Sequence, residues 1–188
     1  MSKTINYTIH FYSDWHCGSG LSSGVDKNTL VIKDRNGLPF FPGKTLKGLL
    51  REAVEEINGF MPIKKTPDEL NAVFGSDDNK QGVCFFSNAR LEAKASEEIK
   101  KDRLQKYLYR TLVSTAIDEY GIADEHSLRS MEVTVPCDLE GKIMNIPADF
   151  TELIEKGLKF IKRLGQNRNR GLGRCTIQST TIEEGGSV

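Results

Sequence analysis

Residues 37–51 read Gly-Leu-Pro-Phe-Phe-Pro-Gly-Lys-Thr-Leu-Lys-Gly-Leu-Leu-Arg, and this stretch constrains the fold more than any other. Pro39 and Pro42 exclude a helix before Gly43, because proline fixes φ and biases the preceding residue toward extended backbone. Further along, apolar residues recur at helical spacing: Leu46, Leu49, Leu50, Ala53, Val54 and Ile57. We therefore predict an amphipathic helix that begins at residues 43–45 and buries one face.

The first two turns of this predicted helix carry Lys44, Lys47 and Arg51, with no acid before Glu52. Free backbone N–H groups at a helix N-terminus favour anions, and nearby cations strengthen that preference. The stretch is thus a candidate phosphate-binding helix start, and an ordinary loop-to-helix junction with solvated lysines explains it equally well. A Walker A loop is disfavoured, because Leu38 stands where that motif requires glycine.

Charge is segregated within a chain whose formal net charge is zero. Between residues 158 and 174 there are six cations and no acid, namely Lys159, Lys162, Arg163, Arg168, Arg170 and Arg174. Such a stripe in a neutral protein indicates a local site for an anionic partner. At 188 residues with 38% hydrophobic content, the chain is expected to form a single domain, 1–188, with a real core.

Several functional classes are disfavoured by what the sequence lacks. The chain opens on polar residues, which argues against a signal peptide, and no run approaches the length of a membrane span. The four cysteines (Cys17, Cys84, Cys137 and Cys175) are scattered, without metal-ligand spacing. We therefore expect no structural metal, and a reduced cytoplasmic protein with free thiols.

The remaining elements follow from periodicity and turn signals. We predict strands at 4–12, 29–33, 83–92, 130–135 and 175–182, and helices at 67–74, 96–113 and 149–164 besides the one that begins at 43–45. Asp149 and Glu152 have the spacing of a capping box, and Asp14 is assigned to a turn or cap. A long glycine- and serine-rich loop covers 13–28, a connection covers 58–82, a glycine-rich loop covers 165–174, and 183–188 forms a frayed tail.

The main elements run strand, helix, strand, strand, helix, strand. This is the ferredoxin-like (RRM-like) split βαβ arrangement of the α+β class, with an antiparallel sheet and two main helices. Many proteins of unrelated function share it, so the fold alone does not decide the function.

Three stretches together resemble the RAMP (repeat-associated mysterious protein) superfamily, and most closely the repeating backbone subunit of type III CRISPR effector complexes. The first runs from the loop containing Asp26 through 31–34 to 37–51. The second is Ile-Asp-Glu-Tyr-Gly-Ile-Ala at 117–123. The third is Arg-Leu-Gly at 163–165, followed by Arg-Asn-Arg-Gly-Leu-Gly-Arg at 168–174. The sequence departs from the family at 42–45, where Pro-Gly-Lys-Thr replaces the common Pro-Gly-Ser-Ser.

The resemblance implies that copies of the chain stack along a CRISPR RNA beside other effector subunits. It implies that a thumb, here about 115–131, displaces nucleotides of the guide–target duplex at a spacing of about six. It also implies a metal-dependent endoribonuclease that cleaves the target RNA, with Asp26 in the position of the family's loop aspartate and Mg²⁺ or Mn²⁺ as cofactor.

The residue types of the glycine-rich loop and the first helix support RNA binding. Glycine lets the backbone approach phosphates closely, and arginine can fork onto phosphate oxygens. A helix C-cap with solvated arginines is the plainer interpretation of the loop. The candidate RNA-binding residues are Lys44, Thr45, Lys47, Arg51, Gly165, Asn167, Arg168, Arg170, Gly171, Gly173 and Arg174.

For cleavage, the Asp26 carboxylate would hold Mg²⁺ or position the attacking ribose 2′-hydroxyl. His16 is a second catalytic candidate, because histidine titrates near neutrality. A loop aspartate bonded to nearby N–H groups, and a structural histidine, are the plainer interpretations. Two other functions stay open: a purely structural RAMP subunit, and a ferredoxin-like enzyme or regulator that binds a small phosphorylated ligand at 43–45.

Overall fold

The computed structural model describes residues 2–20, 29–76, 80–122 and 127–183. Within these residues the fold is built on a six-stranded antiparallel sheet in the order β2-β4-β7-β1-β8, with β3 also paired to β7. Its strands are β1 (Ser2–Phe11), β2 (Phe40–Phe41), β3 (Phe85–Phe86), β4 (Ala89–Arg90), β7 (Asp138–Pro147) and β8 (Cys175–Glu183). The predicted α+β, ferredoxin-like class is confirmed.

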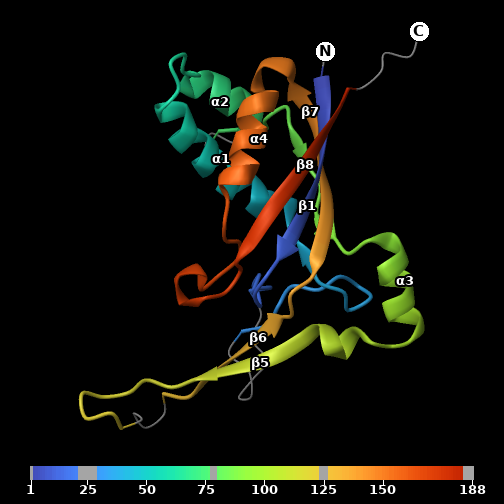
Figure 1. Cartoon of the computed structure of the whole chain (residues 1–188), viewed down its shortest axis with the longest axis vertical. Helices are drawn as coiled ribbons and strands as arrows, with labels where there is room; N and C mark the ends of the chain where they lie inside the picture. Colours follow the sequence, from blue (N-terminus) through green and yellow to red (C-terminus); the bar gives the residue numbers. More distant parts are fainter. Residues whose placement is uncertain (1, 21–28, 77–79, 123–126, 184–188) are drawn as a thin grey trace.

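The N-terminal strand β1 lies between β7 and β8 (Figure 1). Its alternation places Ile5 and Ile9 at 0% exposure on the inner face, where Ile9 faces Leu139 of β7 on one side and Ile177 of β8 on the other. Apolar residues at every second position therefore fix the register, because a slip by one residue would turn them to solvent. The predicted strands at 4–12 and 175–182 are confirmed.

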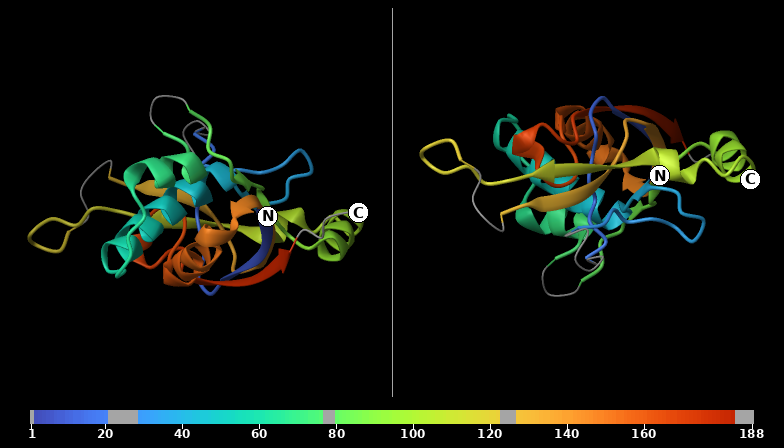
Figure 2. Two further views of the ribbon diagram at one scale, coloured as in Figure 1. Left: turned by 90° about the horizontal axis from the view of Figure 1, so that it is seen from above. Right: turned by 90° about the horizontal axis from the view of Figure 1, so that it is seen from below.

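Two helices, α1 (Gly43–Gly59) and α4 (Thr151–Phe160), cover one face of the sheet (Figures 1 and 2). On α1, Leu46 and Leu50 are fully buried, which contributes roughly 1.5–3 kcal/mol for each side chain. The helices approach closely at Gly157 of α4, where an added Cβ would lie 2.8 Å from Leu50 Cδ1. The predicted helix start at 43–45 is confirmed.

The third long strand, β7 (Asp138–Pro147), was missed by the sequence prediction, which placed strands at 83–92 and 130–135 instead. Only the short β3 and β4 occupy 83–92. In β7 the inward positions are Leu139, Gly141 and Ile143, and the glycine interrupts the apolar pattern. The Tyr7 ring fills that place, because a Cβ on Gly141 would lie 2.3 Å from its hydroxyl oxygen.

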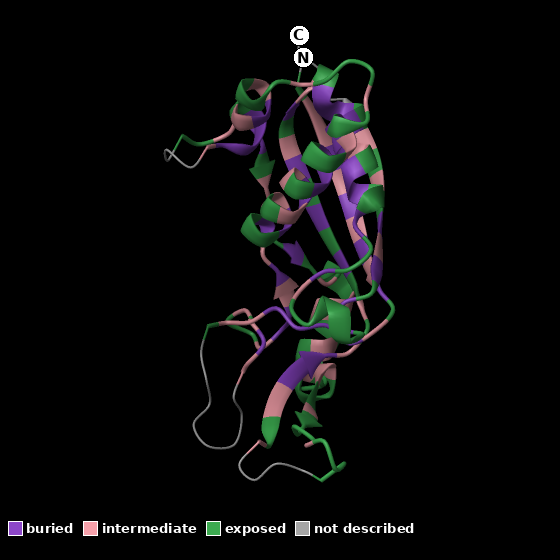
Figure 3. Cartoon of the chain, turned by 90° about the vertical axis from the view of Figure 1, so that its left-hand side faces the viewer, coloured by how far each residue is buried: buried purple, intermediate pink, exposed green. Residues whose placement is uncertain are grey.

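The segment predicted as a strand at 130–135 belongs to a separate hairpin of β5 (Tyr109–Ser114) and β6 (Arg129–Thr134), which projects from one end of the sheet (Figure 1). Its base is buried at the end of β6, whereas its far end is exposed (Figure 3). The hairpin starts before and ends after the predicted thumb at 115–131, part of which lies outside the described residues.

The surface helix predicted at 96–113 is wrong in its second half. Helix α3 (Ala93–Lys101) ends before Arg103, whose φ of 53° lies in the left-handed region. A 3-10 turn, η1 (Gln105–Leu108), then leads directly into β5. The predicted strand at 29–33 is also not regular, since Val31 and Lys33 form only isolated bridges to Gly18 and Pro39.

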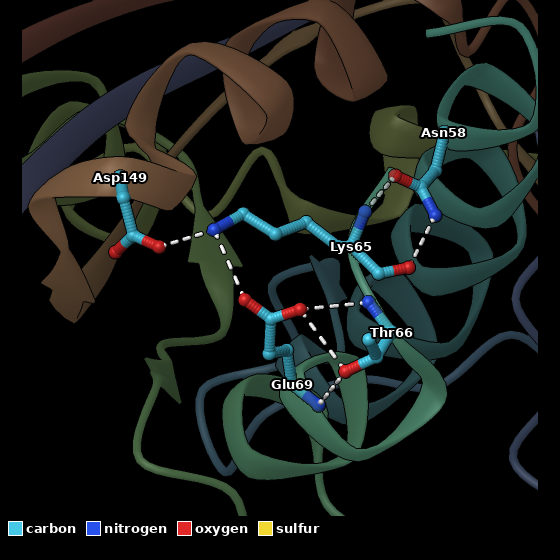
Figure 4. Close-up of polar contacts among 5 residues, drawn as sticks. All are labelled: Asn58, Lys65, Thr66, Glu69 and Asp149. Atoms are coloured by element: carbon cyan, nitrogen blue, oxygen red, sulfur yellow. Dashed lines mark hydrogen bonds and ion pairs between the residues drawn. The ribbon is translucent and has the colours of Figure 1, made fainter. Parts of the chain in front are cut away.

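The connection at 58–82 contains helix α2 (Pro67–Phe74), as predicted, and a capping box in which Thr66 and Glu69 bond to each other's backbone N–H groups (Figure 4). The capping box predicted at Asp149 is wrong. Asp149 lies in the 3-10 turn η2 (Ala148–Phe150) before α4 and makes no cap. Its carboxylate instead binds Lys65 Nζ and raises the pKa of Lys65. Helix α4 ends at Phe160, four residues before the predicted Leu164.

Candidate nucleic-acid interface

The glycine-rich loop at 165–174 is folded against the segment that follows β1. The Gln166 N–H donates to the His16 carbonyl at 2.8 Å, and the Gly173 N–H donates to the Asp14 carbonyl at 2.7 Å. An added Cβ would lie 2.4 Å from the His16 oxygen at Gly165 and 1.8 Å from the Leu164 oxygen at Gly173. Glycine at these two positions lets the loop backbone pack closely against neighbouring backbone. The sequence prediction did not include this structural role.

Two cations of the loop are exposed to solvent. Arg168 and Arg170 are exposed on the 3-10 turn η3 (Arg168–Arg170), which follows Asn167 in the left-handed conformation. The Arg170 N–H donates to the Asn167 carbonyl at 2.8 Å, and the Arg163 guanidinium binds the Arg168 carbonyl. The backbone of the turn is therefore fixed internally. Among the described residues, no carboxylate pairs with the side chains of Arg168 or Arg170.

A groove of about 950 Å³ separates this turn from helix α1. It is lined by Leu49, Glu52, Ala53 and Glu56 of α1, by 160–163, and by 165–170. One wall is cationic, and the opposite wall carries two exposed glutamates, which no sequence argument had assigned to the site. Because carboxylates repel anions, the electrostatics favour an anionic ligand that follows the loop wall of the groove.

The start of α1 does not form the anion site that the sequence suggested. The Gly43 N–H donates to Asn88 Oδ1 at 2.9 Å, and the N–H groups of Thr45 and Leu46 donate to the Pro42 carbonyl. An added Cβ on Gly43 would lie 2.2 Å from the Phe86 carbonyl oxygen, so strand backbone covers this end of the helix. Three of its first N–H groups are thus taken by the protein itself.

The cations predicted on α1 separate in the structure. Lys44 and Lys47 line a smaller pocket of about 160 Å³ beside β3, away from the glycine-rich loop. Arg51 is bonded internally: it donates to Glu55 Oε1 at 2.8 Å, to the Gly75 carbonyl at 2.6 Å and to Asn71 Oδ1 at 2.7 Å. These bonds join α1 to α2, so Arg51 is not free to bind phosphate.

Arg174 immediately precedes β8 and lies outside the groove lining. Its guanidinium carbon lies 5.9 Å from the centre of the Tyr12 ring, which is 56% exposed. The pair resembles a cation stacked on an aromatic face, a surface on which a base can also stack. Thr45 and Gly171 are both exposed, and an added Cβ at Gly171 would meet no described atom within 4 Å.

Of the two catalytic candidates, His16 and Asp26, the described structure places only His16. His16 is fully buried, with Nδ1 2.7 Å from the Glu132 carbonyl oxygen. A general acid or base must reach its substrate, so the geometry supports a structural role for His16. Asp26 lies outside the described residues.

Two buried acids lie at the base of the hairpin: Asp14, which the sequence analysis assigned to a turn or cap, and Glu132, which it did not consider. The Asp14 carboxylate binds the guanidinium of Arg110 on β5. The Glu132 carboxylate on β6 accepts from Lys33 Nζ at 2.9 Å and from the Val31 N–H at 3.2 Å. Each partner is about a hundred residues away in sequence, so no local pattern could have revealed these pairs.

The described residues contain no group of three or more metal-ligating side chains. Nor is any helix in the described part of the chain long and apolar enough to cross a membrane. The free thiols are buried or half-buried, and burial raises the pKa of Cys84 and Cys175 to about 12.

Fold and site together define an α+β protein of ferredoxin-like topology with an exposed cationic loop and a projecting hairpin. The chain belongs to the RAMP superfamily, whose family model matches residues 8–176. No curated protein is significantly similar in sequence. A chain in a cryo-EM structure of the Type III-B Cmr-beta bound to cognate target RNA has the same fold, with a TM-score of 0.69 and 18% sequence identity. The alignment covers 97% of this chain and 61% of that one.

Proposed function

We propose that the chain is a guide-RNA-binding backbone subunit of a type III CRISPR effector complex. The observation that carries the proposal is the exposed turn at 168–170, which a RAMP-superfamily chain holds rigidly beside an open groove. Cytoplasmic location, stacking of copies into a filament, and contact with target RNA and other effector subunits belong to the same proposal.

RNA would bind along the loop wall of the groove. Arg168 and Arg170 can fork onto phosphate oxygens, and both lack a carboxylate partner among the described residues. Their turn is fixed before RNA arrives, so little ordering is required on binding. Of the other predicted cations, Lys44, Lys47 and Arg174 remain candidates for flanking phosphates.

A binding assay tests this proposal. The chain is titrated against fluorescently labelled single-stranded RNA, alone and with its effector partners, as wild type and as the double variant Arg168→Ala/Arg170→Ala. Each lost phosphate contact should flatten the log–log salt dependence by about 0.7. Lys94→Ala/Lys100→Ala is the matched control, because it removes two exposed cations from α3. Equal losses in the two double variants would place the binding surface elsewhere.

Target-RNA cleavage is the second part of the proposal, and it depends on Asp26. The described residues offer no cluster of metal ligands, and Asp26 lies outside them. Cleavage of RNA complementary to the guide, in Mg²⁺ and in EDTA, tests this part with wild type and Asp26→Ala. Regularly spaced products that need the metal and vanish in the variant would support a metal-dependent endoribonuclease. Tight guide binding without cleavage would support a structural RAMP subunit.

Binding of a small phosphorylated ligand at 43–45 is not favoured. Such a site needs free N–H groups, and those of Gly43, Thr45 and Leu46 are already bonded to protein acceptors.

A further inference from the structure

Residues 13–16, which we call the connector, lie between the glycine-rich loop and the hairpin. On the loop side, Asp14 and His16 accept bonds from Gly173 and Gln166 through their carbonyl oxygens, at 2.7 and 2.8 Å. The Arg174 N–H donates to Ser13 Oγ at 2.9 Å. Three positions at the two ends of the loop, 166, 173 and 174, are thus bonded to one short segment.

The same connector also holds the base of the hairpin. Trp15 forms a two-way bridge with Thr134, with N···O distances of 3.0 and 2.9 Å. His16 Nδ1 lies 2.7 Å from the Glu132 carbonyl oxygen, and the Asp14 carboxylate binds Arg110. Asp14 and His16 therefore bond to the loop through their carbonyl oxygens and to the hairpin through their side chains.

Four of these links join backbone to backbone and two join a side chain to backbone, whereas the Asp14–Arg110 pair joins two side chains. The Asp14 side chain is 4% exposed, whereas the Arg110 side chain is 61% exposed. Removing the guanidinium would leave a buried carboxylate without its cation, which is strongly unfavourable. Asp14 would then have to move, and its carbonyl holds Gly173.

We propose that Asp14 is a positioning residue, which through Arg110 couples the glycine-rich loop to the hairpin. This inference rests on the proposed function, in which the loop binds guide RNA. Loosening the hairpin base loosens the loop, and RNA bound at the loop stiffens the hairpin. The connector transmits this coupling, because a shift of its bonds to the hairpin also shifts its bonds to the loop.

Hydrogen exchange followed by mass spectrometry tests the coupling in the full chain. Without RNA, Arg110→Ala should speed exchange by about tenfold both at the hairpin base and at 165–174. Arg129→Ala is the matched control, because it removes an exposed arginine at the far end of the same hairpin. Arg110→Lys, which keeps the charge, should restore part of the protection in both regions. Faster exchange in the hairpin alone would overturn the proposal.

The same measurement with saturating single-stranded RNA separates this inference from the proposed function. In the wild type, RNA should slow exchange in β5 and β6. In Arg110→Ala the RNA should still bind through Arg168 and Arg170, while the slowing of the hairpin is lost. Hairpin slowing that survives in Arg110→Ala would overturn the coupling. A wild type that binds no RNA would refute the proposed function, and the RNA-free comparison would still decide whether Asp14 couples the two elements.

Discussion

Two glycines of the same loop allow a matched test of how the exposed cationic turn at 168–170 is held. Both Gly171 and Gly173 have left-handed backbone, with φ of 90° and 70°. Alanine at either position should destabilise the fold by about 1–2 kcal/mol through this conformation alone. Nothing described lies within 4 Å of an added Cβ at Gly171, whereas at Gly173 the Leu164 carbonyl oxygen lies 1.8 Å away.

Alanine at Gly173 must therefore displace the backbone. Two bonds depend on its position, from the Leu164 N–H to its carbonyl at 2.9 Å and from its own N–H to Asp14 at 2.7 Å. Their loss adds about 1 kcal/mol each. We expect Gly173→Ala to lower the free energy of unfolding by about 3–4 kcal/mol, against about 1–2 kcal/mol for Gly171→Ala.

Urea unfolding followed by tryptophan fluorescence measures both free energies, since Trp15 is fully buried and lies in the connector to which the loop is bonded. RNA affinity should fall further for Gly173→Ala than for Gly171→Ala. Equal losses of stability in the two variants would refute the conclusion that this loop is seated on the connector through Gly173.

Three further predictions concern other parts of the chain. Glu52→Gln/Glu56→Gln removes two acids from the groove and should raise RNA affinity in the binding assay; an unchanged affinity would place RNA outside the groove. Arg51→Ala should lower the free energy of unfolding by about 1–3 kcal/mol in urea, because it removes the bonds between α1 and α2, while RNA affinity stays unchanged; a selective loss of affinity would contradict its structural role. Stability should be greatest below pH about 8.5 and fall above it, because burial keeps Cys84 and Cys175 protonated in the fold while the unfolded thiols ionise. Midpoints of urea unfolding that rise between neutral and alkaline pH would contradict the predicted loss of stability.

The sequence was sufficient wherever a pattern was local and uninterrupted. The apolar alternation of β1 and the helical spacing from Leu46 onward predicted their elements and buried faces correctly. The apolar alternation failed to predict β7, because an inward position of this strand is Gly141, where the Tyr7 ring of β1 takes the place of a side chain. It failed again at β5, because the leucines at helical spacing, Leu104, Leu108 and Leu112, run across the 3-10 turn η1 into a strand whose partner follows a long connection.

The candidate site, too, could be predicted only where its residues lie close together in sequence. The exposure of Arg168 and Arg170 followed from charge and glycine content near one another in sequence. The internal role of Arg51 could not be foreseen, since it depends on the Gly75 carbonyl and on Asn71 of a later helix. Likewise, the pairing of Asp14 with Arg110 exists only once the hairpin folds back onto the end of β1.

Sequencing the RNA that co-purifies with the chain tests the central claim most directly. The tagged chain is expressed with a CRISPR array and the partner subunits of a type III complex, as wild type and as Arg168→Ala/Arg170→Ala. The wild type should retain RNAs of discrete length that match the guides of the array, and the double variant should retain far less. Wild-type chain that carries no guide RNA, or only random RNA, would contradict the account.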